Sequence, residues 1–202
     1  MLSKKEVIYF MKIIVASVPG AGKTTVLNFV KKKLPSAKIV NVGDLILEIV
    51  KKKFKIKDRD ELRKKLSLEQ QRELQEEAYK KISEMEGKYV FIDTHLAIKT
   101  PKGYFPGLSE KTVEIIKPEL IIVLEFPPKD ILERRLKDKK RRRDIEDEEE
   151  IAEHQRINRE FAIAAASDAQ AAVEIISFEE RQKKDFEHAK IAAEKIVRVV
   201  KK

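Results

Sequence analysis

Five short runs of apolar residues alternate along the chain with longer segments in which apolar residues recur every three to four positions. The runs cover residues 12–16, 38–42, 88–93, 120–126 and 172–177, and several are rich in β-branched residues. Runs this short and apolar predict buried strands, whereas the segments between them predict helices. Strands that alternate with helices indicate a mainly parallel five-stranded sheet with helices on both faces, a three-layer α/β/α sandwich.

Capping and breaking residues set the expected ends of the helices. Pro35 stops the first helix, Asp44 is expected to cap the second, and Pro128 suits the first turn of a later one. Ser67 and Gln70 have the spacing of a capping box and predict the start of a long helix. The expected helices cover residues 24–33, 44–53, 67–86, 109–117, 128–138 and 148–166.

The remaining segments complete the outline of a single domain over residues 1–202. Residues 94–108 contain Pro and Gly at several positions and are expected to form a loop. The C-terminal helix should pack on the core through apolar residues spaced by threes and fours. These are Phe186, Ala189, Ala193, Ile196 and Val200. Residues 1–10 precede the first strand and are interpreted as an N-terminal extension.

A glycine-rich segment stands directly between the first strand and the first helix. Residues 17–24 read Ser-Val-Pro-Gly-Ala-Gly-Lys-Thr, the spacing of a Walker A phosphate-binding loop, with Ser17 in place of its first glycine. Such a loop directs backbone N–H groups at phosphate oxygens, which requires positions without a Cβ, here Gly20 and Gly22. Lys23 would reach the β- and γ-phosphates of ATP, and Thr24 would offer its hydroxyl to Mg²⁺.

The loop predicts a P-loop NTPase fold, and the alternative is an accidental glycine-rich turn between a strand and a helix. The expected ATP-binding residues are Ser17, Val18, Pro19, Gly20, Ala21, Gly22, Lys23, Thr24 and Thr25. Asp93 ends the third predicted strand. Because ligands bind outside the carboxyl ends of strands in open α/β sheets, Asp93 is expected to face the Mg²⁺ held at the loop. A helix cap or turn residue is the alternative for Asp93.

A dense group of arginines follows the fourth strand and its helix. Guanidinium groups stabilise the charge of a transferring phosphoryl group through a planar fork of donors and a permanent charge. The expected catalytic residues are Lys23, Arg135, Arg141 and Arg143. Residues 138–147 are predicted to form a short lid that orders over a polyphosphate. A solvated basic loop or an RNA-binding patch is the alternative.

Several polar and aromatic residues keep two interpretations. Asn158 and Arg159 follow the apolar stripe of helix 148–166 and are either satisfied within the core or directed at a ligand. His95 either touches an acceptor site or has no role there, and the other two histidines are interpreted as incidental. Tyr104 and Phe105 either stack on an adenine or anchor their loop.

Composition narrows the setting in which the chain works. The absence of Cys excludes disulfides, cysteine–metal sites and thiol nucleophiles. Charged residues make up 39%, dominated by Lys and Glu, which is typical of proteins that work at high temperature. The net charge of +9 suits anionic nucleotides or RNA, but most Lys residues lie in predicted helices, so nucleic-acid binding is not favoured. No segment predicts a membrane span or a signal peptide, and a cytoplasmic location is expected.

The chain resembles archaeal-type adenylate kinases from about Met11 onward. The similar segments are 17–25, Val42-Gly43-Asp44, 58–64, Ile92-Asp93-Thr94-His95, 99–108 and 135–144. The Asp-Thr-His segment and the Thr-Pro-Lys-Gly-Tyr-x-Pro-Gly-Leu run are the most specific of these. The chain departs from the wider adenylate-kinase pattern at Ser17. It also departs after Gly43-Asp44, where it lacks an Arg.

The resemblance implies reversible transfer between ATP and AMP, which gives two ADP, with Mg²⁺ as cofactor. It implies a second nucleotide site in the helices of residues 44–86 and a homotrimer, as members of the family often form. The AMP-binding residues implied are Gly43, Asp44, Arg63, Thr94 and His95, and the metal-binding residues are Thr24 and Asp93. The alternatives are a kinase for another nucleoside monophosphate or a small molecule, and a nucleotide-gated RNA-binding or assembly factor.

Overall fold

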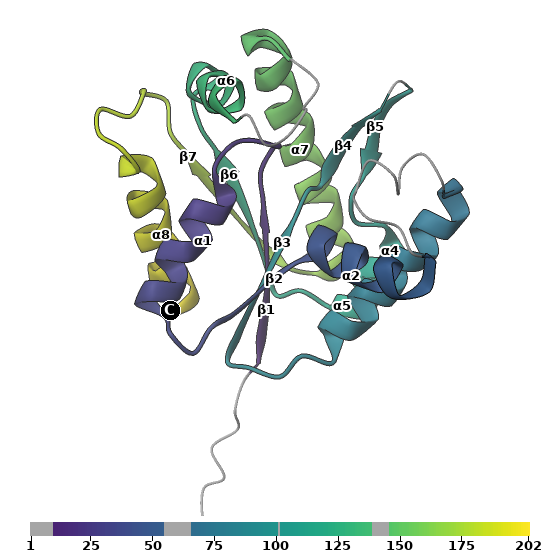
Figure 1. Cartoon of the computed structure of the whole chain (residues 1–202). Coiled ribbons are helices and arrows are strands. Elements are labelled where there is room, and N and C mark those ends of the chain that lie inside the picture. Colours follow the sequence, from purple (N-terminus) through teal and green to yellow (C-terminus); the bar gives the residue numbers. More distant parts are fainter. Residues whose placement is uncertain (1–9, 55–65, 101, 139–145) are drawn as a thin grey trace, which may run out of the picture.

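One sheet of five parallel strands forms the centre of the molecule. The computed structural model describes residues 10–54, 66–100, 102–138 and 146–202. The strands lie in the order β2-β3-β1-β6-β7 (Figure 1). They are β1 (Met11–Ala16), β2 (Lys38–Asn41), β3 (Tyr89–Thr94), β6 (Leu120–Glu125) and β7 (Ala172–Ser177). All five were predicted from the apolar runs, and the parallel sheet is confirmed.

Helices cover both faces of this sheet. They are α1 (Lys23–Lys33), α2 (Val42–Phe54), α4 (Leu68–Ser83), α5 (Glu110–Ile116), α6 (Pro128–Lys137), α7 (Glu148–Ala169) and α8 (Glu187–Val200). Side chains alternate between the faces of a strand, so Ile13 and Val15 of β1 pack with α1 and α8. Ile14 and Ala16 pack on the opposite face with α4, α5 and α7 (Figure 1). The predicted three-layer sandwich is therefore confirmed.

The carboxyl ends of the central strands meet at one edge of the sheet. Ala16, the last residue of β1, lies opposite Thr94 of β3 and Val123 of β6. Asn41, the last residue of β2, lies opposite Asp93. This register brings the ends of β2 and β3 beside the loop that leaves β1.

The prediction of a loop over residues 94–108 is wrong, because this segment contains a β-hairpin. Strands β4 (Ala97–Thr100) and β5 (Gly103–Pro106) pair antiparallel. At the turn, Gly103 takes a left-handed φ of 108° and its carbonyl accepts a hydrogen bond of 2.8 Å from Thr100 Oγ1. Of the Pro and Gly residues that suggested a loop, Gly103 begins β5 at the turn and Pro106 is the last residue of β5.

Two other predictions about helix ends are corrected. Helix α2 begins at Val42, and the Asp44 N–H donates to Asn41 Oδ1 at 3.0 Å, so Asn41 serves the first turn in place of Asp44. Phe186 does not belong to the buried stripe of α8, because it takes a left-handed φ of 60° before the helix and is 56% exposed. His188 and Ala192 are buried there instead.

A small apolar cluster joins α2 and α4 apart from the two main cores. Its buried members are Ile49, Val50, Leu66, Leu74 and Ala78. Residues 1–9, 55–65 and 139–145 lie outside the described residues, and most of the predicted extension, part of segment 44–86 and most of the predicted lid lie there. Among the described residues, no helix combines the length and the apolar character that crossing a bilayer requires.

Candidate functional site

The loop between β1 and α1 needs glycine at two positions. Gly20 and Gly22 have φ values of 84° and 95°, a region that residues with a Cβ rarely adopt. Gly22 also immediately precedes the first turn of α1, where backbone N–H groups have no partner within the helix. An anion placed here would meet these N–H groups and the positive end of the helix dipole.

Ser17 fits the position at which the Walker pattern has a glycine. It is not among the described non-glycine residues with a positive φ, so its backbone does not require glycine. The side chain is buried, and its hydroxyl donates to the carbonyl oxygen of Val18 at 3.2 Å. The departure from the pattern therefore leaves the loop intact.

Three side chains hold the carbonyl groups of alternate loop residues. His95 Nδ1 donates to the Ser17 oxygen at 2.7 Å, Arg135 Nε to the Pro19 oxygen at 2.8 Å, and Arg134 Nη1 to the Ala21 oxygen at 2.8 Å. The carbonyl and N–H groups of one trans peptide point in opposite directions. The N–H groups that follow Pro19 and Ala21, which belong to Gly20 and Gly22, are therefore directed away from the two arginines.

His95 acts as a neutral donor in this arrangement. Because its partner is a carbonyl oxygen, Nδ1 carries the hydrogen. Burial, together with the nearby charge of Lys23, lowers the pKa of His95 to about 3. The ring thus stays uncharged near neutral pH while it holds Ser17.

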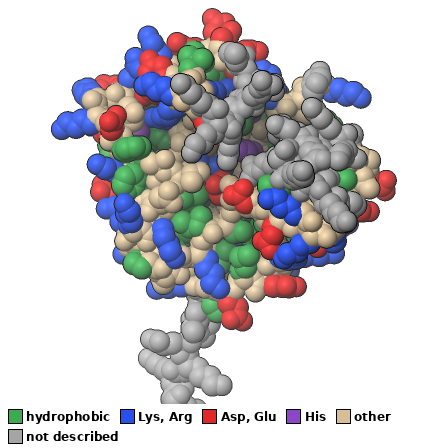
Figure 2. Space-filling model, viewed as in Figure 1, with side chains coloured by type: hydrophobic (Ala, Val, Ile, Leu, Met, Phe, Trp, Pro, Cys, Tyr) green, Lys and Arg blue, Asp and Glu red, His purple; other side chains and the backbone are tan. Residues whose placement is uncertain are grey.

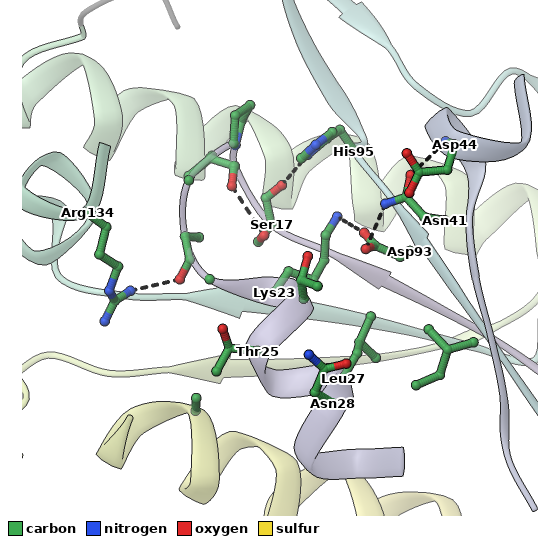
Figure 3. Close-up of a pocket in the computed structure, with 18 of the residues that line it drawn as sticks. Ser17, Lys23, Thr25, Leu27, Asn28, Asn41, Asp44, Asp93, His95 and Arg134 are labelled. Atoms are coloured by element: carbon green, nitrogen blue, oxygen red, sulfur yellow. Dashed lines mark hydrogen bonds and ion pairs between the residues drawn. The ribbon is translucent and has the colours of Figure 1, made fainter. Parts of the chain in front are cut away.

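Lys23 and Asp93 form a buried ion pair at the start of α1. Lys23 Nζ lies 2.8 Å from Asp93 Oδ1 (Figure 3). It also donates to the backbone oxygen of Thr94. Burial lowers the pKa of Lys23, whereas the charge and hydrogen bond of Asp93 oppose this shift. Asn41 Nδ2 donates to the other carboxylate oxygen at 2.9 Å. The structure therefore brings Asp93 to the loop through Lys23, and the contacts of Lys23 with phosphate and of Asp93 with Mg²⁺ stay predictions.

Asn41 is a site residue that the sequence analysis missed. Its side chain joins Asp93 to the first turn of α2, through the bond to Asp93 and the bond from the Asp44 N–H (Figure 3). Its place at the carboxyl end of β2 was the signal that could have identified it, because ligands bind at such ends.

These residues line one large cleft with a volume of about 1500 Å³. The loop of residues 17–25 forms one wall, and Asn41, Asp44 and Glu48 contribute to the opposite wall. Arg134 also lines the cleft, although the sequence analysis favoured its neighbours. Among the described residues on the face in Figure 2, Lys and Arg are interspersed with Asp and Glu.

Comparisons with known proteins place this site in a family. The AAA domain family matches residues 16–152. An adenylate kinase of Pyrobaculum aerophilum is 50% identical over 191 residues, which cover 94% of this chain and 96% of the relative. One from Pyrococcus horikoshii is 44% identical over 179 residues, which cover 88% and 90%. The chain belongs to the adenylate kinase family.

The fold of this adenylate kinase family member also resembles that of more distant kinases. A shikimate kinase from Bacteroides thetaiotaomicron superposes with a TM-score of 0.62 at 18% identity, over 95% of this chain and 99% of the other. The resemblance to archaeal adenylate kinases is thus confirmed. The composition, which is typical of proteins that work at high temperature, agrees with relatives from thermophilic archaea.

Among the arginines expected to act in catalysis, only Arg135 lies in the described part of this adenylate kinase family member. Its side chain is 6% exposed, contacts Pro19 and Glu146, and does not line the cleft. Its direct contact with a phosphoryl group stays a prediction. Arg141 and Arg143 lie outside the described residues, as does Arg63 of the expected AMP site.

The polar residues of α7 are satisfied within the protein. Asn158 Oδ1 accepts hydrogen bonds from the N–H groups of Leu96 and Ala97, both at 3.3 Å. Arg159 pairs with the carboxylate of Glu125. The first of the two interpretations therefore holds for Asn158, and the described contacts of Arg159 also lie within the chain. In the adenylate kinase family member, α7 thus fixes the strand ends that carry the site.

The structure favours one of the two expected roles for Tyr104 and leaves both open for Phe105. The Tyr104 ring packs against His154, with centroids 5.0 Å apart, which favours anchoring. Phe105 is 40% exposed. His154 and His188 were interpreted as incidental, but both are buried, and His154 bonds to Glu146 and to the Ala97 oxygen.

Proposed function

We propose that this member of the adenylate kinase family transfers the terminal phosphoryl group of ATP reversibly to AMP, with Mg²⁺, giving two ADP. The observation that carries the proposal is the loop of residues 17–22, whose carbonyls are fastened on one side and whose glycine amides are directed to the other. Identity to archaeal adenylate kinases over most of the chain supports the same activity.

The loop would hold ATP through its backbone and through Lys23. The amides of Gly20 and Gly22 and the first turn of α1 would donate to phosphate oxygens. Lys23 would exchange its partners at the end of β3 for the β- and γ-phosphates, which compensate its charge better than a carbonyl does. Because positioning and charge stabilisation supply most of the rate in such transfers, no general base is needed.

The residues beside the loop fit a magnesium ion. Mg²⁺ prefers hard oxygen ligands and commonly takes one or two from protein while substrate phosphates supply others. Thr24 offers an exposed hydroxyl in the first turn of α1, and Asp93 offers a carboxylate at the end of β3. When bound with ATP, the ion would neutralise charge on the phosphate oxygens.

The opposite wall would receive AMP. Asp44 lines the cleft in the first turn of α2, beside Gly43. His95 lines the cleft, whereas Thr94 is buried beside it with its Oγ1 3.2 Å from the Tyr79 hydroxyl, and a contact of either residue with AMP stays a prediction. Arg63 stays a prediction for the AMP phosphate, and Arg141 and Arg143 stay predictions for the transferring group. A cytoplasmic location and a homotrimer are further parts of this proposal.

The test is a coupled assay of ADP formation that varies ATP and AMP separately. Lys23→Ala should lower the rate by about 10²- to 10³-fold, the cost of losing one preorganised charge-stabilising donor. Lys32→Ala removes an exposed lysine from the same helix that does not line the cleft, and it should leave the rate unchanged. A fully active Lys23→Ala chain would contradict the proposal. A preference for CMP or UMP over AMP would instead assign the chain another acceptor.

A further inference from the structure

Glu146 is a buried carboxylate surrounded by nitrogen-bearing side chains from three elements, two of them cations. It is 4% exposed. Arg135 Nη1 of α6 donates to its Oε2, His154 Nδ1 of α7 lies 3.1 Å from its Oε1, and Lys99 Nζ of β4 lies 3.2 Å from the same oxygen. A buried carboxylate with this many partners is fixed in position, because each partner lost would leave a charge uncompensated.

The electrostatics agree that Glu146 stays ionised. Burial by itself would raise the pKa of Glu146, but the hydrogen bonds and charges of His154 and Arg135 lower it to about 2. His154 Nε2 also faces the Ala97 oxygen at 3.0 Å, so both ring nitrogens lie beside acceptor oxygens. Glu146 therefore presents a full negative charge to Arg135 over the whole range in which the protein would be assayed.

Arg135 has the geometry of a link between Glu146 and the loop. A guanidinium is rigid and planar, so a bond that fixes one nitrogen also fixes the direction of the others. Nη1 is held by Glu146, and Nε donates to the Pro19 oxygen at 2.8 Å. Nη2 is buried and has no hydrogen-bond partner among the residues that the structure describes. Glu146 is thus the anionic group that sets the plane of Arg135.

We propose that Glu146 is a positioning residue for the ATP-binding loop, acting through the Arg135 guanidinium on the carbonyl of Pro19. This inference rests on the proposed function, because it concerns how the loop holds ATP phosphates. The peptide that joins Pro19 to Gly20 carries both the fastened carbonyl and the amide directed to the opposite side. With Glu146 present, that amide keeps the direction that phosphate binding needs before ATP arrives.

The proposal separates ATP from AMP. The Pro19–Gly20 peptide belongs to the loop wall, whereas Asn41, Asp44 and Glu48 belong to the opposite wall. Loss of the fastening should therefore weaken ATP binding and leave AMP binding unchanged. A merely structural loss would affect both nucleotides together.

The decisive variant is Glu146→Gln, which keeps the shape of the side chain and removes its charge. The KM for ATP and the Kd of a non-hydrolysable ATP analogue measured by calorimetry should rise about tenfold, the worth of one charge-assisted hydrogen bond. The KM for AMP should stay unchanged. Glu150→Gln is the matched control. Glu150 lies one turn further along the chain, is 48% exposed and also contacts Lys99, at 3.0 Å, but among the described residues it makes no bond to the loop or to Arg135.

A double-mutant cycle tests whether Glu146 acts through Arg135. A lysine offers a single point charge and cannot hold both Pro19 and Glu146 in the arginine's geometry. Arg135→Lys should therefore raise the KM for ATP, and adding Glu146→Gln to that chain should change it little further. Glu146→Asp, which keeps the charge, should cause a smaller rise than Glu146→Gln and serves if the glutamine variant fails to fold.

Two results would overturn the inference. One is an equal change in the ATP and AMP parameters of Glu146→Gln and Glu146→Asp, which would indicate a general loss of structure. The other is a fully additive cycle, which would give Arg135 and Glu146 independent roles, as a direct contact of Arg135 with phosphate would. A wild-type chain that binds the ATP analogue but forms no ADP would contradict the proposed function and leave the binding test in force.

Discussion

The two walls of the cleft are held by different kinds of interaction. The loop wall is fastened by hydrogen bonds and buried charges, with His95, Arg134 and Arg135 on three of its carbonyls. The opposite wall, formed by α2 and backed by α4, is held by apolar contacts, both in a small cluster between the two helices and in the main core, which Tyr79 and Ile82 of α4 join. Hydrogen bonds are directional and hold donor and acceptor at a distance defined to within tenths of an ångström. Apolar contacts are less directional and tolerate small displacements.

This difference matches what each wall would have to do. A wall that must direct amides at phosphate oxygens gains from being preorganised, since misdirected donors lose most of their effect. A wall that must close on an acceptor gains from contacts that tolerate small displacements, as apolar contacts do. The comparison therefore separates a wall held by directional bonds from a wall held by apolar contacts.

The largest effect is expected at Gly107. This residue lies between the backbone of His95, which holds the loop wall, and α4, which backs the opposite wall. Its N–H donates to the Leu96 oxygen at 2.7 Å, and its carbonyl accepts from Gln75 of α4 at 2.6 Å. A Cβ at this position would lie 1.7 Å from the backbone oxygen of His95. Gly107→Ala should therefore displace backbone on both sides and lower the free energy of unfolding by about 4 kcal/mol or more, measured by chemical denaturation.

Gly103→Ala provides the control within the same hairpin. Gly103 has a left-handed φ of 108°, but a Cβ there would meet nothing within 4 Å. Its cost should be backbone strain alone, about 1 to 3 kcal/mol. If Gly107→Ala weakened the binding of only one nucleotide, Gly107 would support one wall alone and would not connect the two.

A medium effect is expected from the apolar cluster of the second wall. Leu74→Ala removes a side chain that is 4% exposed in α4, and should lower the opening free energy of α2 and α4 by about 2 to 3 kcal/mol. Hydrogen exchange should show faster amides in these helices, with α1 and β1 unchanged. Leu27→Ala, at a residue 2% exposed in the main core, should instead lower protection throughout the domain. Uniform loss in both variants would mean that the walls unfold as one unit.

The phosphate loop could be predicted from sequence because its chemistry is contiguous. Gly20, Gly22 and Lys23 lie within four positions, directly after an apolar run, and each residue type follows from the geometry of phosphate binding. The five parallel strands were equally accessible, since each is a short apolar run between helical segments. The local sequence pattern was sufficient to predict a feature wherever the residues that determine it are neighbours in the sequence.

The side chains that hold the carbonyl groups of the loop could not be predicted, because they come from distant positions in the sequence. His95, Arg134 and Arg135 are separated from their loop partners by 78, 113 and 116 residues. Nothing local distinguishes an arginine that holds a carbonyl from one that meets a phosphate, since the same side chain suits both. Asn41 was missed for a related reason, because its importance depends on the register that places it opposite Asp93.

An effect confined to acid should distinguish the charged wall from the apolar one. The pKa of Glu146 falls from 4.5 to about 2 on folding, because hydrogen bonds and charges from His154 and Arg135 outweigh the burial that would raise it. Between these values the unfolded chain takes up the proton and the folded chain does not. The stabilisation is therefore complete above about pH 4.5 and is lost as the pH falls toward 2.

Glu146→Gln should reduce the dependence of the unfolding free energy on pH in acid. The slope of unfolding free energy against pH between 4.5 and 2 should decrease by up to about 1.4 kcal/mol per pH unit, the linkage of one proton. Denaturant titrations at a series of pH values measure it. Leu74→Ala adds no titratable group, so it should lower the curve without changing its slope. An unchanged slope in Glu146→Gln would mean that the Glu146 carboxylate does not cause the loss of stability in acid. The contrast between the two walls would then rest on hydrogen bonds alone.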